Sequence, residues 1–142
     1  MVGASADEWW RRAESELESA KILKISGKAA EAYFHAGQAI EFGLKALYLK
    51  RNNLSEMPAD HKGANWHNLA MCATAARLHV DLKQPGVSRD LRAAWLTVRD
   101  WKSNARFPDM KVPKQEINDL FVAVCNDRDG VWQWLRRIYQ SI

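Results

Sequence analysis

AEAYFHAGQAIEFGLKALYLKR, residues 30–51, is the stretch that decides the fold. Apolar and small side chains recur in it every three or four residues, which is the period of an α-helix rather than of a half-buried strand. The pattern predicts a helix from about Ala29 to Lys50. Its inner stripe is rich in alanine and glycine, so that another helix can approach closely, and consists of Ala32, Tyr33, Ala36, Ala39, Ile40, Gly43, Leu44 and Leu47.

The same period recurs on both sides of this segment, so we expect an all-α protein. Ser5 and Glu8 have the spacing of a capping box at the start of the first helix, and Gly27 ends that helix. Ser88 caps a later helix, which Pro108 stops because it disfavours helical geometry at the residue before it. In order, the expected helices cover residues 5–27, 29–50, 66–79, 88 to 104 or 106, and 113–138.

The last of these helices contains NDRDG, residues 126–130, which has the composition of a turn. The apolar stripe nevertheless keeps its phase across this segment, since four apolar residues from Ile117 to Ile138 are each seven positions apart. A break would normally reset that phase. We therefore predict one long helix with an exposed weak point at Gly130.

The length of 142 residues allows one buried core, so we expect a single domain over residues 1–142. No apolar run approaches the roughly 20 residues of a membrane span. The N-terminus has no basic segment followed by an apolar one, as a signal peptide would. A cytoplasmic protein without membrane contact is expected. Cys72 and Cys125 fall among apolar positions and outside any CxxC pair, which indicates buried thiols.

Positive charge is concentrated in one third of the chain. Residues 61–111 hold nine Lys or Arg against four Asp or Glu, whereas the rest of the chain is nearly balanced. A local field of this sign favours partners that carry phosphate. A basic face that only keeps the protein in solution explains the same pattern equally well.

RDWKSNARFP, residues 99–108, places two arginines, an acid and several polar groups at the expected end of a helix. If the helix persists, Arg92, Arg99 and Arg106 lie on one stripe, and such a row of guanidinium groups suits phosphate oxygens. Asp100 would orient these cations. The alternative is a solvated helix face with surface ion pairs. The predicted phosphate- or nucleotide-binding residues are Arg92, Arg99, Lys102, Ser103, Asn104 and Arg106.

The pattern of the second helix and the end of the fourth together resemble the HEPN family, the higher eukaryotes and prokaryotes nucleotide-binding domain. The resemblance implies an up-and-down bundle of four to five helices that forms a homodimer and binds RNA or a nucleotide. It also implies a nucleotidyltransferase partner protein and a toxin–antitoxin-like or defence system. The residues that carry it are Gln38, Glu41, Leu44 to Leu47, His67, Asn68, Leu69, and Ala105 to Pro108.

Many members of this family are metal-independent ribonucleases in which an arginine and a nearby histidine act on RNA. Arg99 matches the arginine, but Asn104 stands where the histidine would be, which leaves a degenerate Arg-x4-Asn motif. An amide does not exchange protons near neutral pH, and general acid–base catalysis contributes about 10² to 10⁴ in rate. We therefore expect binding rather than cleavage. Arg99 and Asn104 would be catalytic only in a ribonuclease that takes its histidine from elsewhere, and a protein-interaction bundle is a third alternative.

The remaining polar residues of note are histidines and lysines. His61 and His67 have no further ligands at a suitable spacing, so no metal ion and no cofactor is predicted. We interpret His35 as a core or interface histidine and His67 as a hydrogen-bonding residue at the start of the third helix. Either could approach Arg99 in space. Lys45 and Lys50 are interpreted as facing solvent.

The chain also has seven tryptophans, more than one small bundle is expected to bury, since each ring buries about 150 to 250 Å². Some of them are therefore expected at a subunit interface, where two basic helix ends would meet. Tryptophans half exposed over polar loops are the alternative.

Overall fold

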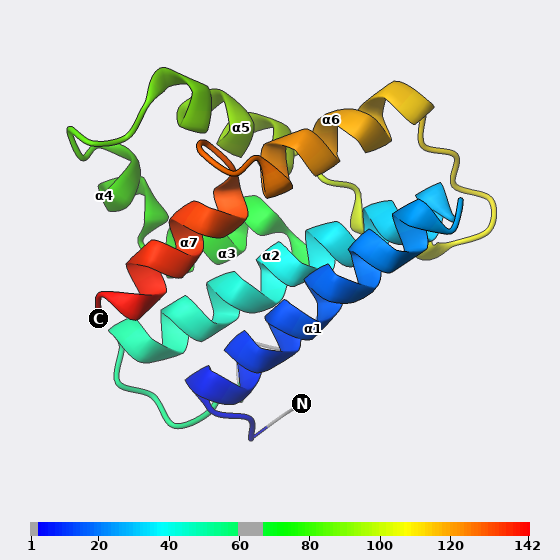
Figure 1. Ribbon diagram of the computed structural model, residues 1–142. Helices are drawn as coiled ribbons and strands as arrows, with labels where there is room; N and C mark the ends of the chain where they lie inside the picture. Colours follow the sequence, from blue (N-terminus) through cyan, green and yellow to red (C-terminus); the bar gives the residue numbers. More distant parts are fainter. Residues whose placement is uncertain (1–2, 60–66) are drawn as a thin grey trace.

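The computed structural model describes residues 3–59 and 67–142, and within these ranges every regular element is helical (Figure 1). His61, Lys62 and Trp66 lie outside the described residues, as does the side chain of Arg106. The all-α prediction is confirmed. The elements are α1 (Ala6–Ile25), α2 (Ala29–Arg51), α3 (Leu69–Ala75), α4 (Leu78–Leu82), α5 (Arg89–Arg99), the 3₁₀ turn η2 (Ser103–Arg106), α6 (Lys114–Cys125) and α7 (Val131–Gln140).

The two longest helices, α1 and α2, form an antiparallel hairpin along which the later helices lie (Figure 1). The predicted capping box starts α1, since the Glu8 amide donates to Ser5 Oγ at 3.2 Å and the Ser5 amide donates to Glu8 Oε1 at 3.1 Å. Gly27 reverses the chain with a φ of 81°, a conformation that glycine adopts without strain. Both helices therefore follow from local signals in the sequence.

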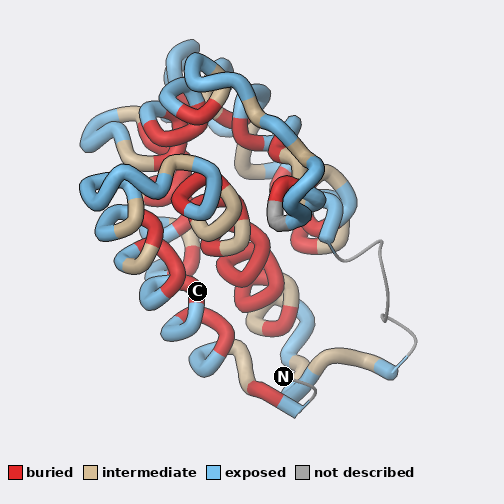
Figure 2. Tube along the Cα trace, turned by 90° about the vertical axis from the view of Figure 1, so that its right-hand side faces the viewer, coloured by how far each residue is buried: buried red, intermediate tan, exposed pale blue. Residues whose placement is uncertain are grey.

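Helix α2 is buried along most of its length (Figure 2) and packs against α1, α3, η2, α6 and α7. Its small residues make this possible. A Cβ atom added at Gly37 would lie 1.9 Å from Cε2 of Trp101, so the indole ring occupies the space that glycine leaves. The Trp101 indole also donates to the Tyr33 carbonyl oxygen at 3.2 Å. The segment after α5 is thereby fixed to the N-terminal half of α2.

The tryptophans of the described residues are buried inside this one chain, with at most 8% of each residue exposed. Trp10 stacks on Trp132 and on Tyr139, with ring centroids 4.9 and 4.6 Å apart, and the Tyr139 hydroxyl donates to Asp7 at 2.5 Å. For these rings the expectation of exposure at a subunit interface is wrong, because they stack on one another and on the small residues of α2, while Trp66 lies outside the described residues. The buried tryptophans are Trp9, Trp10, Trp95, Trp101, Trp132 and Trp134.

The third predicted helix is broken in two. Arg77 adopts a left-handed conformation with a φ of 60° between α3 and α4, so the helix does not run on to residue 79. A guanidinium group from α2 stabilises this break, since Arg51 donates to the Ala76 carbonyl at 2.8 Å and pairs with Asp81 at 2.6 Å. The prediction failed because the partner of the broken end comes from a distant part of the sequence.

The last predicted helix is also two helices, α6 and α7, and the prediction of a continuous rod is wrong. Asn126 Oδ1 accepts from the amides of Arg128 and Asp129 at 3.0 and 2.9 Å, a side-chain turn that replaces helical hydrogen bonds. At Gly130 an added Cβ would lie 2.3 Å from the Asn126 carbonyl oxygen, so the turn needs glycine there. The apolar stripe keeps its phase because both helices pack against α2.

Two lysines of α2 are not solvent-facing, contrary to their interpretation from the sequence. Lys45 is buried, and its ammonium group lies 2.7 Å from Glu41 Oε2. Lys50 is partly buried, donates to the Tyr139 carbonyl at 2.9 Å and lies over that tyrosine ring. In the part of the chain that the structure describes, no helix is long and apolar enough to cross a membrane.

Candidate functional site

Helix α5 ends at Arg99, five residues or more before the end predicted from Pro108. After Asp100 the chain turns back onto α2, where the Trp101 ring fills the space at Gly37 and the Lys102 amide donates to the Tyr33 hydroxyl at 2.8 Å. A helix that continued would carry the ring away from this position. The stripe of Arg92, Arg99 and Arg106 required a continuous helix, and that condition is not met.

The predicted cations differ in how far the fold already engages them. Arg92 donates through Nε and Nη2 to the Leu82 carbonyl oxygen at 3.2 and 3.0 Å, at the end of α4. Lys102 pairs with Glu116 at 3.0 Å. Arg99 is the most available of the three: its side chain is 44% exposed, about as much as that of Lys102, but its carboxylate neighbour, Asp100, is 3.8 Å away. An exposed pair at that distance contributes little to binding energy.

Ser103 and Asn104 lie in the η2 turn, which packs against α2. Asn104 is exposed and Ser103 is partly buried. The structure therefore brings three predicted site residues, Lys102 to Asn104, to the N-terminal half of α2, and Arg99 ends the helix that leads to them. It separates Arg92 from them, because that side chain caps α4.

A cavity of about 410 Å³ lies between the N-terminal half of α2 and the segment that follows η2. One wall comes from α2 and the other from residues 105–112, so the cavity adjoins the predicted site. Its polar side chains are Glu31, His35 and Lys111, which can offer an acceptor, an imidazole and a cation. The apolar lining residues are Ala30, Phe34, Ala105, Phe107, Pro108, Met110 and Val112.

His35 is held at this cavity by a buried carboxylate on α1. Its Nδ1 lies 2.5 Å from Glu16 Oε2, and the other oxygen of Glu16 accepts from Arg12 Nε at 3.0 Å. Only 7% of the Glu16 side chain is exposed, compared with 32% of the His35 side chain. Glu16 was not predicted from the sequence. A signal was present, because Glu16 lies in helical register with Ala13 and Ala20 on the buried face of α1, and a buried acid needs a partner.

His67 lies just before α3 and forms a hydrogen bond, as expected, but it does not cap the helix. That role belongs to Asn68, whose Oδ1 accepts from the Met71 amide at 3.1 Å. His67 Nδ1 instead lies 3.2 Å from Glu41 Oε1, while the other oxygen of that carboxylate, Oε2, accepts from Lys45. Among residues 3–59 and 67–142, no three histidine, cysteine or acidic side chains are placed to hold a metal ion.

Neither cysteine is among the described residues that line the cavity beside η2. Cys72 is buried and Cys125 is half-buried. Burial raises the pKa of Cys72 to about 12, an effect that the Lys45 charge partly offsets, and burial also raises the pKa of Cys125. The interpretation as buried thiols is confirmed for Cys72, while Cys125 is only partly covered.

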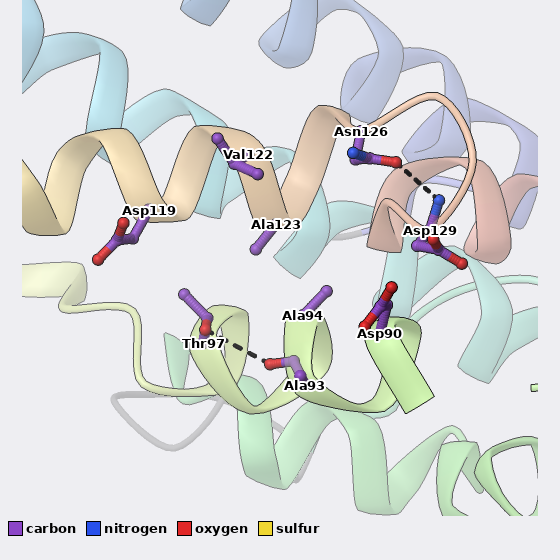
Figure 3. A pocket seen from close by; sticks show the side chains of 9 residues that line it. All are labelled: Asp90, Ala93, Ala94, Thr97, Asp119, Val122, Ala123, Asn126 and Asp129. Carbon is purple, nitrogen blue, oxygen red and sulfur yellow. Dashed lines mark hydrogen bonds between the residues drawn. The ribbon is translucent and has the colours of Figure 1, made fainter. Parts of the chain in front are cut away.

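A second hollow, of about 390 Å³, lies between α5 and α6 and has the opposite chemistry (Figure 3). Asp90 and Asp129 lie at one end of it and Asp119 lies further along α6. No lysine or arginine is among its described lining residues, so it repels phosphate groups. The other residues that line it are Ala93, Ala94, Thr97, Val122, Ala123 and Asn126.

Comparisons with known proteins agree with the helical architecture. A family model, described as HEPN domain, matches residues 6–122, which extend from the start of α1 through most of α6. Searches of curated proteins and of solved structures gave no match.

Proposed function

Because the chain belongs to the HEPN domain family, we propose that it binds RNA or a nucleotide at the end of α5 and along the η2 turn, which lies against α2. Family membership relates the chain to nucleotide- and RNA-handling modules in general terms. The exposure of Arg99 supports the more specific proposal. Its guanidinium group is exposed at a helix end, with its carboxylate neighbour 3.8 Å away, so a phosphate can approach it.

The other proposed contacts follow from their distance to Arg99 along the chain and from their partners. Lys102, Ser103, Asn104 and Arg106 would complete the phosphate- or nucleotide-binding surface, with Lys102 exchanging its Glu116 partner for the ligand. Arg92 would contribute least, since its guanidinium group already holds the Leu82 carbonyl. Asp100 would orient Arg99 only weakly.

Binding of a labelled single-stranded RNA at several salt concentrations tests this proposal. We expect the logarithm of the affinity to fall linearly with the logarithm of the salt concentration, because phosphate contacts release counterions. Arg99→Ala is expected to weaken binding and to reduce the salt slope by about 1. Arg89→Ala is the matched control, since Arg89 is exposed on the first turn of the same helix. Affinity that does not depend on salt would contradict the proposal.

The proposal extends to a homodimer in the cytoplasm that works with a nucleotidyltransferase partner in a toxin–antitoxin-like or defence system. Exposed apolar side chains support a second copy, because such groups favour burial at an interface. Light scattering of the purified chain tests the dimer, and co-purification with a nucleotidyltransferase encoded beside it tests the partner. The exposed residues include Ile22, Ile25, Leu96 and Val122.

A ribonuclease is the second candidate function. The sequence argued against it, because Asn104 stands where the proton-carrying histidine of the motif would be. The observation that favours it is the imidazole of His35, which lines the cavity beside the η2 turn.

A further inference from the structure

His35 has one ring nitrogen fixed by the fold and one that no described residue engages. Nδ1 lies 2.5 Å from Glu16 Oε2, and a carboxylate oxygen accepts hydrogen bonds. The hydrogen of the neutral imidazole therefore lies on Nδ1, and Nε2 keeps its lone pair. A carboxylate that fixes the tautomer and the ring orientation in this way is the arrangement found behind histidines that accept protons.

Glu16 is itself well held, which makes the orientation of the imidazole rigid. Its second oxygen accepts from Arg12, and its side chain is 7% exposed on the inner face of α1. Because α1 and α2 pack against each other along their length, neither the acid nor the histidine is carried by a loop. Groups mounted on packed helices hold their geometry better than groups on loops.

The cavity in front of His35 has the size and lining of a site for one nucleotide unit. It measures about 410 Å³, and aromatic and aliphatic side chains make up most of its surface. Lys111 supplies a cation for a phosphate, and Glu31 can accept from a ribose hydroxyl or a base amino group. Ala105 belongs both to the cavity wall and to the η2 turn, so a strand bound along η2 passes the opening.

We propose that His35 is the catalytic proton carrier of this HEPN domain and that the cavity takes the nucleotide whose 2′-hydroxyl it deprotonates. Glu16 is its positioning residue. The inference rests on the proposed function, because an RNA strand must first bind along residues 99–106. It places the proton carrier on α2 rather than at position 104, where the resemblance would place a histidine and the chain has Asn104.

The step needs no metal ion and no other reactant. Nε2 takes the proton of the 2′-hydroxyl while O2′ forms a bond to the adjacent phosphorus atom, and the bond from phosphorus to O5′ breaks. The departing O5′ takes a proton from water, and the imidazolium then returns its proton to the solvent. The products are a 2′,3′-cyclic phosphate and a 5′-hydroxyl, so atoms and charge balance. Lys111 would stabilise the charge on the phosphate oxygens.

The test compares two oligonucleotides of the same sequence in buffer with EDTA. Single-stranded RNA reports cleavage, and its 2′-deoxy counterpart, which lacks the attacking hydroxyl, reports binding alone. We expect the wild-type chain to cleave the RNA and mass spectrometry to find a 2′,3′-cyclic phosphate on the product. His35→Gln should lower kcat by about 10² to 10⁴ and leave the affinity for the 2′-deoxy strand within about twofold. The matched control is His79→Gln, because His79 is exposed on α4, outside the cavity.

Glu16→Gln separates positioning from folding. The amide can remain in the buried position but can also donate to Nδ1, so the tautomer is no longer fixed. We expect kcat to fall while KM and the melting temperature change little, whereas a purely structural role would lower the melting temperature and leave kcat unchanged. Wild-type chain that binds the 2′-deoxy strand and leaves RNA intact, or His35→Gln that cleaves at the wild-type rate, overturns this inference alone. A wild-type chain that binds neither strand overturns the proposed function as well.

Discussion

Two glutamates of the α1–α2 hairpin each hold a histidine, and the two pairs differ in what surrounds them. In the Glu16–His35 pair the carboxylate has one exposed partner, Arg12, and the imidazole lines a cavity. In the Glu41–His67 pair the carboxylate is also bound to the buried Lys45. A buried acid that a buried lysine neutralises supports the fold, whereas Glu16 pairs with the exposed Arg12 and holds a histidine that lines a cavity and is available for chemistry.

The largest expected effect is on the Glu41–His67 pair. Lys45→Met leaves the Glu41 carboxylate buried without its cation, and breaking a buried ion pair from one side costs about 3–5 kcal/mol in the free energy of unfolding. Denaturant unfolding measures this cost. The double change Lys45→Met with Glu41→Leu removes both charges and should recover most of the loss. A single variant as stable as the wild type would show that the pair does not stabilise the fold.

The next largest effect is expected at Gly37, two residues after His35 on α2. Gly37→Ala would place a Cβ atom 1.9 Å from the Trp101 ring, which also donates to the Tyr33 carbonyl, so the ring must move. Overpacking of this kind costs about 1–3 kcal/mol. Because the ring fixes the chain that leads to η2, RNA binding should weaken as well. Gly86→Ala is the control, since an added Cβ there meets nothing within 4 Å, and thermal unfolding with an RNA titration makes both measurements.

A smaller effect is expected from the second histidine. His67 is 46% exposed and lies 3.2 Å from Glu41, so His67→Gln should change the free energy of unfolding by less than about 1 kcal/mol. Cleavage of RNA should stay at the wild-type rate, in contrast to the loss expected for His35→Gln. Equal losses of cleavage in the two variants would remove the functional distinction between the pairs.

The smallest effect at neutral pH is expected at Cys72, whose thiol feels both charges of the Lys45–Glu41 pair. Burial raises its pKa to about 12 from an ordinary 9.0, so the folded protein keeps this proton where the unfolded chain loses it. The stability that this thiol contributes is fully present below pH 9 and is lost as the pH rises toward 12. Unfolding curves across that range should fall less steeply for Cys72→Ala than for the wild type, and parallel curves would contradict the raised pKa.

Much of the fold could be predicted because its signals are local. The capping box at Ser5, the cap at Ser88 and the small-residue stripe of α2 lie within the helices they define. The breaks could not be predicted, since they depend on side chains that arrive from elsewhere. Arg51 reaches the carbonyl of Ala76, and Trp101 enters the space at Gly37.

The candidate site divides in the same way. Arg99 was predicted as a phosphate-binding residue inside a helix that runs on to residue 104 or 106, whereas α5 ends at Arg99 itself. The partner of His35 was not predicted, because Glu16 is 19 positions away on another helix and pairing requires the packed hairpin. The sequence allowed His35 to approach Arg99, but the buried carboxylate that orients this histidine comes from α1 through tertiary packing.

The stacking of Trp10 on Trp132 and Tyr139 has a consequence for how the protein is made. When α1 leaves the ribosome, it presents an indole whose cover is synthesised more than a hundred residues later. Until α7 emerges, that surface is open to chaperones and to association with other nascent chains. Emergence of α7, rather than closure of the α1–α2 hairpin, is therefore the event that completes the hydrophobic core.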